Sequence, residues 1–182
     1  MIIKHNDELS CNHKALVANK KLTINEYLLN IEVICNNFIK QIMIYNHQYF
    51  TEEKIIPVMI LRGGLIFYNP LREFYNTSPL GLLFHQYTDQ DQQEYKVYGD
   101  LPYSDSHPVY LLCDVIINTG HTMVDCIQHI GDGISRDNFS IQIASPYSTK
   151  NGLNRLIENY PDLIVHTLWD DEQLDDNMRL ES

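Results

Sequence analysis

The sequence has no long hydrophobic run, no targeting segment and no paired cysteines. No apolar stretch in its 182 residues approaches the roughly 18 residues that a membrane-spanning helix needs. The opening MIIKHNDELS is too polar for a secretory signal peptide. The four cysteines include no CxxC pair, and Cys35 and Cys113 fall in apolar patterns, so we expect reduced, buried thiols. Together these absences predict a cytoplasmic protein.

Basic residues are scarce as well. Thirteen Lys and Arg stand against 24 Asp and Glu, which gives a net charge of -11. This charge disfavours nucleic acid and anionic membranes as partners, because both present negative phosphates. The charge is uneven, since residues 170–182 carry -5 of it. We therefore expect an acidic, solvated tail at 170–182, while the body of the chain retains room for a local basic site.

Two common nucleotide-binding patterns are missing too. The chain contains neither GxGxxG nor GxxxxGK[ST], so a Rossmann dinucleotide site and a nucleoside-triphosphate P-loop have little support. It also has no internal repeat and no Ser- or Gly-rich linker. With this length, the sequence predicts one domain over residues 1–182, opened by a polar lead-in at 1–22.

What the sequence does contain is an alternation of short apolar runs and helical patterns. Thr23 and Glu26 form a capping-box pattern, after which apolar residues recur at helical spacing to about residue 43. Apolar runs of strand length occupy 55–61, 80–84, 109–113, 139–144 and 163–169, and further helical patterns occupy 65–74, 121–130 and 149–159. This order predicts an α/β fold, a mainly parallel sheet flanked by helices with ligands at the carboxyl ends of its strands.

The segment VYLLCDVIINTGHTM, residues 109–123, has the character of a phosphate-binding loop. An apolar strand is followed by Asp114, a turn with Thr119 and Gly120, and Thr122 at the start of a helix. Such a turn presents free backbone N–H groups, the positive end of a helix dipole and hydroxyl donors. Asp114 is placed to accept hydrogen bonds from sugar hydroxyls or to meet a ligand-held Mg²⁺. The alternative is a purely structural turn between strand and helix.

Four segments in order resemble the type I phosphoribosyltransferases, and the uracil phosphoribosyltransferases in particular. DVIINTGHT (114–122) is similar to their motif for 5-phosphoribosyl-1-diphosphate (PRPP), and IIPVMILRGGL (55–65) to their VVPILRAGL. QIASPYSTKNGLNRL (142–156) and LWDDEQLDDN (168–177) resemble the segments that follow, so the likeness covers roughly residues 20–177. It implies transfer of the 5-phosphoribosyl group of PRPP to a nucleobase, uracil favoured, giving a nucleoside 5-monophosphate and pyrophosphate. It also implies Mg²⁺ as cofactor and a homodimer.

The same resemblance assigns roles to individual residues. Arg62 would bind the pyrophosphate, next to a turn at Gly63 that in the family often contains a non-proline cis peptide bond. Asp114 would face the ribose hydroxyls and, with Arg62, carry catalysis. Mg²⁺ would be held by PRPP, with Asp114 as its one candidate protein contact. The 5-phosphate site would comprise Asn118, Thr119, Gly120, His121 and Thr122, and we do not expect Asn118 to take a proton.

Three departures from the family pattern bear on activity. His121 replaces a residue that is usually Gly, and a simple helix-start histidine is the alternative reading. No Lys or Arg occurs between Arg72 and Lys96, although the family has a basic residue in the loop of this segment. His85 stands at the position of that basic residue. His85 and Lys96 are therefore candidate pyrophosphate contacts. The Gly- and Asp-rich segment that binds uracil in the family does not follow Asn177.

These departures keep two other functions open. One is a non-catalytic protein that binds PRPP or a nucleotide as a regulator or partner subunit, and the other is a transferase with a different acceptor. The polar segment 86–107 is expected to be a long loop or hairpin over one face. Its tyrosines either stack on a base or cover a core edge or dimer contact; they are Tyr87, Tyr95, Tyr98 and Tyr103.

Overall fold

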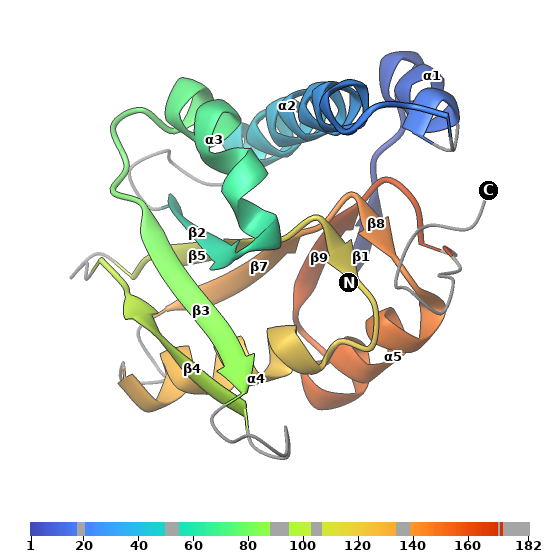
Figure 1. Ribbon diagram of the computed structural model, residues 1–182. Helices are drawn as coiled ribbons and strands as arrows, with labels where there is room; N and C mark the ends of the chain where they lie inside the picture. The colour runs from blue at the N-terminus through green and yellow to red at the C-terminus, as the bar shows by residue number, and fades with distance from the viewer. Residues whose placement is uncertain are drawn as a thin grey trace.

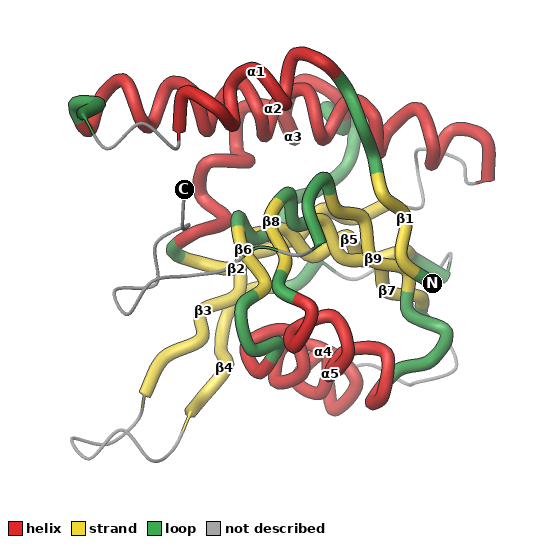
Figure 2. The backbone as a smooth tube through the Cα atoms, turned by 90° about the vertical axis from the view of Figure 1, so that its right-hand side faces the viewer, coloured by secondary structure: helices red, strands yellow, loops and turns green. Residues whose placement is uncertain are grey.

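The computed structural model describes residues 1–17, 21–49, 55–87, 95–102, 107–133, 139–170 and 172. A seven-stranded sheet separates two helical layers, with α1, α2 and α3 on one face and α4 and α5 on the other (Figures 1 and 2). The elements are β1 (Ile2–Lys4), α1 (Glu8–Val17), α2 (Ile24–Tyr49), β2 (Ile55–Leu61), η2 (Gly63–Phe67), α3 (Tyr68–Phe74), β3 (Gly81–Tyr87), β4 (Tyr95–Asp100), β5 (Val109–Cys113), β6 (Ile116–Ile117), α4 (His121–Gly133), β7 (Ser140–Ala144), β8 (Tyr147–Ser148), α5 (Lys150–Asn159) and β9 (Ile164–Thr167).

The strand order in the large sheet is β1-β9-β7-β5-β2-β3-β4. All neighbouring strands run parallel except β3 and β4, which form an antiparallel hairpin. A second, two-stranded sheet pairs β6 with β8. These pairings confirm the expected α/β class, and the hairpin is one of the two forms expected for segment 86–107.

The central strands β2 and β5 are buried on both faces. Every residue of β5 is buried, as is every residue of β2 except Leu61. Continuous apolar runs are typical of parallel strands covered by helices on both sides. The bounds of both strands match the apolar runs of the sequence, and one core cluster lies on each side of the sheet.

Helix α2 begins with the expected capping box. The Thr23 N–H donates to Glu26 Oε2 at 2.8 Å, and the Glu26 N–H donates to Thr23 Oγ1 at 3.3 Å. The helix ends at Tyr49 rather than near residue 43. The polar Asn46 lies on its buried side, where its amide donates to the Tyr75 hydroxyl at 3.4 Å. A polar residue on the buried face explains why hydrophobic periodicity alone ends the helix too early.

Residues 1–17, expected as part of a polar lead-in, form two packed elements. β1 pairs in parallel with β9 at the edge of the sheet, and α1 packs against α2. Polar contacts hold α1 in place: Asp7 accepts hydrogen bonds from the Ser10 N–H and from the side-chain amides of Asn37 and Gln41 on α2. Such contacts leave no apolar periodicity in the sequence to reveal them.

The first residues of the acidic tail are also engaged. Asp170 accepts from the Lys4 ammonium group at 2.7 Å, and Glu172 pairs with Lys14 while keeping only 6% of its side chain exposed. The expectation of a solvated face is therefore wrong for Glu172, whereas Asp170 remains partly exposed. The other tail residues lie outside the described ranges.

The cysteines follow the expectation with one exception. Cys35, Cys113 and Cys126 are buried and Cys11 is exposed, and all four are free. Burial raises the pKa of the Cys126 thiol to about 12. Within the described ranges, no helix combines the length and the apolar character that crossing a membrane requires.

Candidate functional site

The two main motif segments meet at the carboxyl ends of β2 and β5. These strands pair in parallel, so the turn after Leu61 lies beside the loop that begins at Asp114. The approach is close: a Cβ at Gly63 would lie 2.2 Å from Asp114 Oδ1, which leaves no room for a side chain. The Leu61–Arg62 peptide bond is cis, so the cis bond precedes Arg62 and does not join a glycine of the turn. Arg62 is exposed at the edge of this junction.

The carboxyl group of Asp114 is the titratable centre of the junction. Its Oδ1 accepts the Val115 N–H at 2.8 Å. Desolvation raises the pKa of Asp114 to about 7, and the hydrogen bond from Val115 offsets part of that effect. The residue as a whole is half-buried. Asp114 therefore exchanges a proton near neutral pH and, once ionised, gains from any hydroxyl donor or cation.

The loop after Asp114 is anchored on α5. The Thr149 N–H donates to the Ile117 carbonyl at 2.9 Å, and the Thr149 hydroxyl donates to the Asn118 carbonyl. The same hydroxyl oxygen caps α5 by accepting the Gly152 N–H at 3.0 Å. Thr149 was foreseen only as the start of a helical pattern, whereas it also fixes the backbone of the candidate phosphate loop.

The turn itself requires glycine at position 120. Gly120 has a φ of 79°, and a Cβ there would lie 2.8 Å from the Gly152 carbonyl oxygen. Helix α4 begins at the next residue, and the Gly120 carbonyl accepts the Val124 N–H at 3.1 Å. The first N–H groups of a helix have no intrahelical acceptor. The loop thus presents backbone donors together with the positive end of the α4 dipole.

Each threonine hydroxyl of the loop lies beside a histidine. Thr119 Oγ1 is 3.1 Å from His121 Nδ1, and both residues are exposed. Thr122 Oγ1 is 3.5 Å from Nδ1 of His85, which comes from β3. The structure therefore brings His85 to the end of the loop nearest α4.

Asp125 completes the contact of His85 with α4 and was not foreseen. His85 Nε2 is 2.7 Å from Asp125 Oδ2, and the His85 side chain is only 8% exposed. Asp125 stands three residues after Thr122, a spacing that places both on one helix face, so the sequence held a signal that could have identified it.

Lys96 is not part of this group of side chains. Val97 is the register partner of His85, and side chains of successive strand residues point to opposite faces of the sheet. The side chain of Lys96 therefore leaves the sheet on the face opposite to His85.

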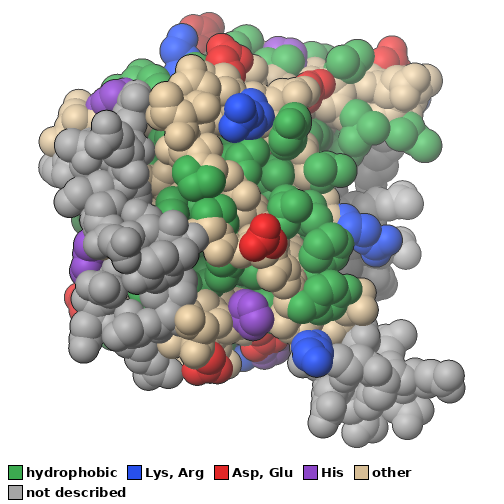
Figure 3. All heavy atoms as spheres, turned by 90° about the vertical axis from the view of Figure 1, so that its left-hand side faces the viewer, with side chains coloured by type: hydrophobic (Ala, Val, Ile, Leu, Met, Phe, Trp, Pro, Cys, Tyr) green, Lys and Arg blue, Asp and Glu red, His purple; other side chains and the backbone are tan. Residues whose placement is uncertain are grey.

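The β3–β4 hairpin carries an exposed aromatic pair. Tyr98 stacks on its cross-strand partner Phe84, with ring centroids 5.3 Å apart and planes at 5°. Phe84 pairs in register with Leu61, so the stack lies next to the Arg62 turn. Figure 3 shows hydrophobic side chains gathered over this side of the molecule. The predictions for the other three tyrosines of segment 86–107 concern side chains outside the described part of the structure.

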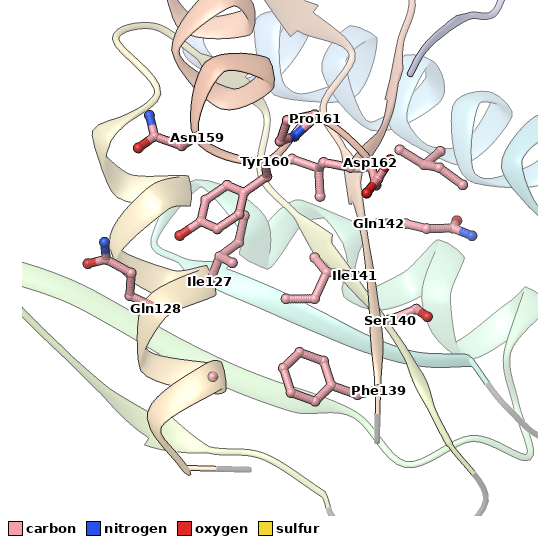
Figure 4. Close-up of a pocket in the computed structure, with 13 residues that line it drawn as sticks. Ile127, Gln128, Phe139, Ser140, Ile141, Gln142, Asn159, Tyr160, Pro161 and Asp162 are labelled. Carbon is pink, nitrogen blue, oxygen red and sulfur yellow. The ribbon is translucent and has the colours of Figure 1, made fainter. Parts of the chain in front are cut away.

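Two hollows accompany these elements. One of about 530 Å³ lies beside Arg62 and Gly63 and is lined by Tyr27 and Ile31 of α2 and by Val115. A larger one, of about 800 Å³, lies between β7 and helices α4 and α5 (Figure 4). Because it adjoins the start of β7, this larger hollow is at the amino ends of the strands, away from Asp114.

Comparison with known proteins gives a consistent result. The family model described as uracil phosphoribosyltransferase matches residues 34–181. The uracil phosphoribosyltransferase of Salinibacter ruber is 26% identical over 130 residues, or 71% of this chain and 60% of its own. That of Campylobacter concisus is 27% identical over 124 residues, or 68% and 58%. The chain thus spans about three fifths of the length of these relatives.

Solved structures share the fold at low sequence identity. The AQ2163 protein from Aquifex aeolicus aligns with a TM-score of 0.79 and 16% identity, over 99% of this chain and 92% of that one. The adenine phosphoribosyltransferase from Trypanosoma brucei, in complex with AMP, pyrophosphate and ribose-5-phosphate, aligns with a TM-score of 0.69 and 14% identity, over 98% and 86%. The chain has the type I phosphoribosyltransferase fold and, by its match over residues 34–181, belongs to the uracil phosphoribosyltransferase family.

Proposed function

We propose that this protein transfers the 5-phosphoribosyl group of PRPP to a nucleobase, with uracil as the favoured acceptor. The bond between ribose C1 and the pyrophosphate oxygen breaks, a bond between C1 and the base nitrogen forms, and the nitrogen's proton leaves to pyrophosphate or solvent. The observation that carries the proposal is the packing of the Arg62–Gly63 turn against Asp114. This packing brings a cationic side chain, a carboxylate and the candidate phosphate loop to the carboxyl ends of β2 and β5.

The loop from Asn118 to Thr122 is the proposed site of the 5-phosphate. Gly120 turns the backbone so that the first N–H groups of α4 are available, and the hydroxyls of Thr119 and Thr122 add two donors. His121 stands at the rim, where its ring contacts Thr119. This donor set suits a small dianion and offers no extended surface for a polyphosphate chain.

Asp114 is the proposed partner of the ribose hydroxyls. As a carboxylate it accepts their hydrogen bonds, and it offers one oxygen ligand toward a Mg²⁺ carried by PRPP, as the family generally uses. A single carboxylate fits a metal whose other ligands come from substrate and water. When bound, Mg²⁺ neutralises charge on the pyrophosphate.

Arg62 is the proposed pyrophosphate ligand. It is exposed at the end of β2, next to the turn that packs on Asp114, so its guanidinium is free to meet an anion there. The fold supports this arrangement in general terms, since the Trypanosoma brucei enzyme with the same fold is described with AMP, pyrophosphate and ribose-5-phosphate. In this reaction the protein mainly positions the reactants and stabilises charge.

The identity of the acceptor base and the oligomeric state are the more specific parts of the proposal. Uracil rests on the family match and on relatives that are 26% and 27% identical. The exposed Phe84–Tyr98 stack supports a homodimer contact on the hairpin, as aromatic residues are enriched at interfaces. Light scattering during size exclusion tests the dimer, and a monomer at micromolar concentration would overturn it.

The deciding experiment for activity combines turnover and binding. PRPP and Mg²⁺ are incubated with uracil, other pyrimidines and purines, and products are separated by chromatography. Formation of UMP and pyrophosphate supports the proposal, and product with another base alone would replace uracil as the acceptor. Calorimetric binding of PRPP without turnover on any base would favour a regulator or partner subunit instead. That alternative is motivated by His85, which stands where the family has a basic residue.

A further inference from the structure

His85 bridges β3 and α4 through two polar contacts. Its Nε2 lies 2.7 Å from Asp125 Oδ2, and its Nδ1 lies 3.5 Å from the hydroxyl oxygen of Thr122. The ring is almost buried, at 8% side-chain exposure, while Asp125 keeps 33%. The imidazole therefore stands between a carboxylate and a hydroxyl of the candidate phosphate loop.

Asp125 determines which ring nitrogen carries a proton. An ionised carboxylate only accepts hydrogen bonds, so at 2.7 Å the Nε2 atom must be the donor. In the neutral ring, Nδ1 then holds a lone pair that faces Thr122. In the protonated ring, Nδ1 carries a hydrogen and becomes a donor to the same hydroxyl.

The two states of the ring direct the Thr122 hydroxyl differently. Against a neutral ring, Thr122 donates its hydrogen to Nδ1 and has none to offer a ligand. Against a protonated ring, Thr122 accepts from Nδ1, and its own hydrogen is free to turn toward a phosphate oxygen. A dianionic phosphate in the loop favours the second state, both by this hydrogen bond and by charge.

We propose that His85 is a positioning residue for the 5-phosphate: held by Asp125, it takes up a proton when a phosphate binds and turns the Thr122 hydroxyl toward it. The inference rests on the proposed function, in which Thr122 faces the 5-phosphate. It assigns His85 to the 5-phosphate end of the ligand, whereas the sequence resemblance suggested the pyrophosphate end. The 3.5 Å contact is expected to shorten when the ligand is bound.

Asp125 is a charged partner of His85 at hydrogen-bond distance, and the neighbouring elements bring other titratable groups near it. Helix α4 also carries Cys126, a buried thiol whose pKa is raised by burial. Strand β4 places the apolar Val97 opposite His85, and Lys96 leaves the sheet on the other face. In the loop, His121 is directed to the Thr119 hydroxyl. The Asp125 carboxylate accepts from Nε2 whichever state Nδ1 is in.

Two conservative variants separate the contacts of the ring. In His85→Asn the side-chain amide reaches the position of Nδ1 and donates permanently to Thr122, whereas in His85→Gln it reaches the position of Nε2 and meets Asp125. His129→Asn is the matched control, because His129 lies on α4 two turns beyond Thr122. Thermal unfolding confirms that each variant is folded.

The test is isothermal calorimetry of UMP, with uridine as the ligand that lacks the phosphate, in two buffers of different ionisation enthalpy. We expect the parent and His129→Asn to take up more protons on binding UMP than His85→Asn does. We expect His85→Gln to lose about tenfold in UMP affinity, and His85→Asn to stay within about threefold of the parent. Uridine should bind all four proteins alike. The losses caused by Thr122→Val and His85→Gln should not add in the double variant.

Three results would overturn the inference. They are equal proton exchange in the parent and His85→Asn, additive losses from Thr122→Val and His85→Gln, or an equal loss for uridine and UMP. Each would leave the proposed function standing, provided the parent binds UMP. A parent that binds neither UMP nor PRPP would refute the proposed function and this inference together.

Discussion

Replacing Asp114 with Asn should stabilise the protein most at pH 8, and at pH 5 by only about a third of that amount. In the folded chain, desolvation raises the pKa of Asp114 from 3.8 to about 7. The folded state therefore binds this proton more tightly than the unfolded state. Between these two values stability falls as the pH rises, and above pH 7 the full cost of the desolvated carboxylate is present. Asn keeps the shape and the acceptor for the Val115 N–H but never ionises.

The size of the effect follows from the same values. A pKa that moves from 3.8 to about 7 corresponds to at most about 4 kcal/mol. Because Asp114 retains some exposure and water screens its charge, we expect about 1 to 2 kcal/mol. For a chain of 182 residues this is a rise of roughly 2 to 8 °C in melting temperature at pH 8.

The same substitution should have the opposite effect on ligand binding. Asn accepts a sugar hydroxyl without charge, so we expect a loss of about 1.5 to 3 kcal/mol in PRPP binding. Differential scanning fluorimetry at pH 5 and pH 8, paired with calorimetry, measures both effects. Asp162→Asn at an exposed position removes the same charge as a control. A variant less stable than the parent by equal amounts at both pH values would refute the desolvation argument, and unchanged PRPP affinity would refute the site assignment.

Three further changes test other parts of the structure. Arg62→Ala should weaken PRPP and pyrophosphate at least tenfold more than UMP in calorimetry; equal losses would mean that Arg62 only supports the fold. Gly63→Ala should lower both melting temperature and PRPP affinity, because its Cβ would lie 2.2 Å from Asp114 Oδ1; if both stay unchanged, the close approach is not required. Burial lowers the pKa of His166 to about 3, so the parent should lose stability as the pH falls below about 6.5. His166→Gln should show a smaller difference in urea unfolding between pH 7 and pH 5, and an equal difference would contradict this assignment.

The parts of the fold that the sequence predicted share a local signal. β2 and β5 are continuous apolar runs, and burial on both faces of a parallel sheet produces that pattern. The start of α2 was also predictable, because Thr23 and Glu26 form a capping-box pattern in the sequence. By contrast, α1 is held through Asp7 by side chains that are distant in sequence. No hydrophobic period marks such an element, so it could not be predicted.

The same distinction between local and long-range signals applies to the candidate site. The turn at Gly63 and the loop from Asp114 to Thr122 are contiguous motifs, and the parallel pairing of β2 and β5 brings them together as expected. The contact of His85 with Asp125 depends on how β3 packs against α4, which residue spacing within either element does not reveal. Short motifs thus predicted which groups the ends of β2 and β5 bring together, and packing between elements determined which groups support them.

The two titratable groups of the site should exchange protons in opposite directions when UMP binds. Asp114 has a pKa raised to about 7, and the ribose hydroxyls favour its charged form, so binding near neutral pH releases a proton there. His85 takes up a proton when the phosphate engages Thr122. Because these effects partly cancel in the parent, Asp114→Asn should show greater net uptake than the parent and His85→Asn greater net release. The double variant should exchange almost none in calorimetry with paired buffers; if it exchanges as much as either single variant, another group controls the proton, and the assignment to these two residues is wrong.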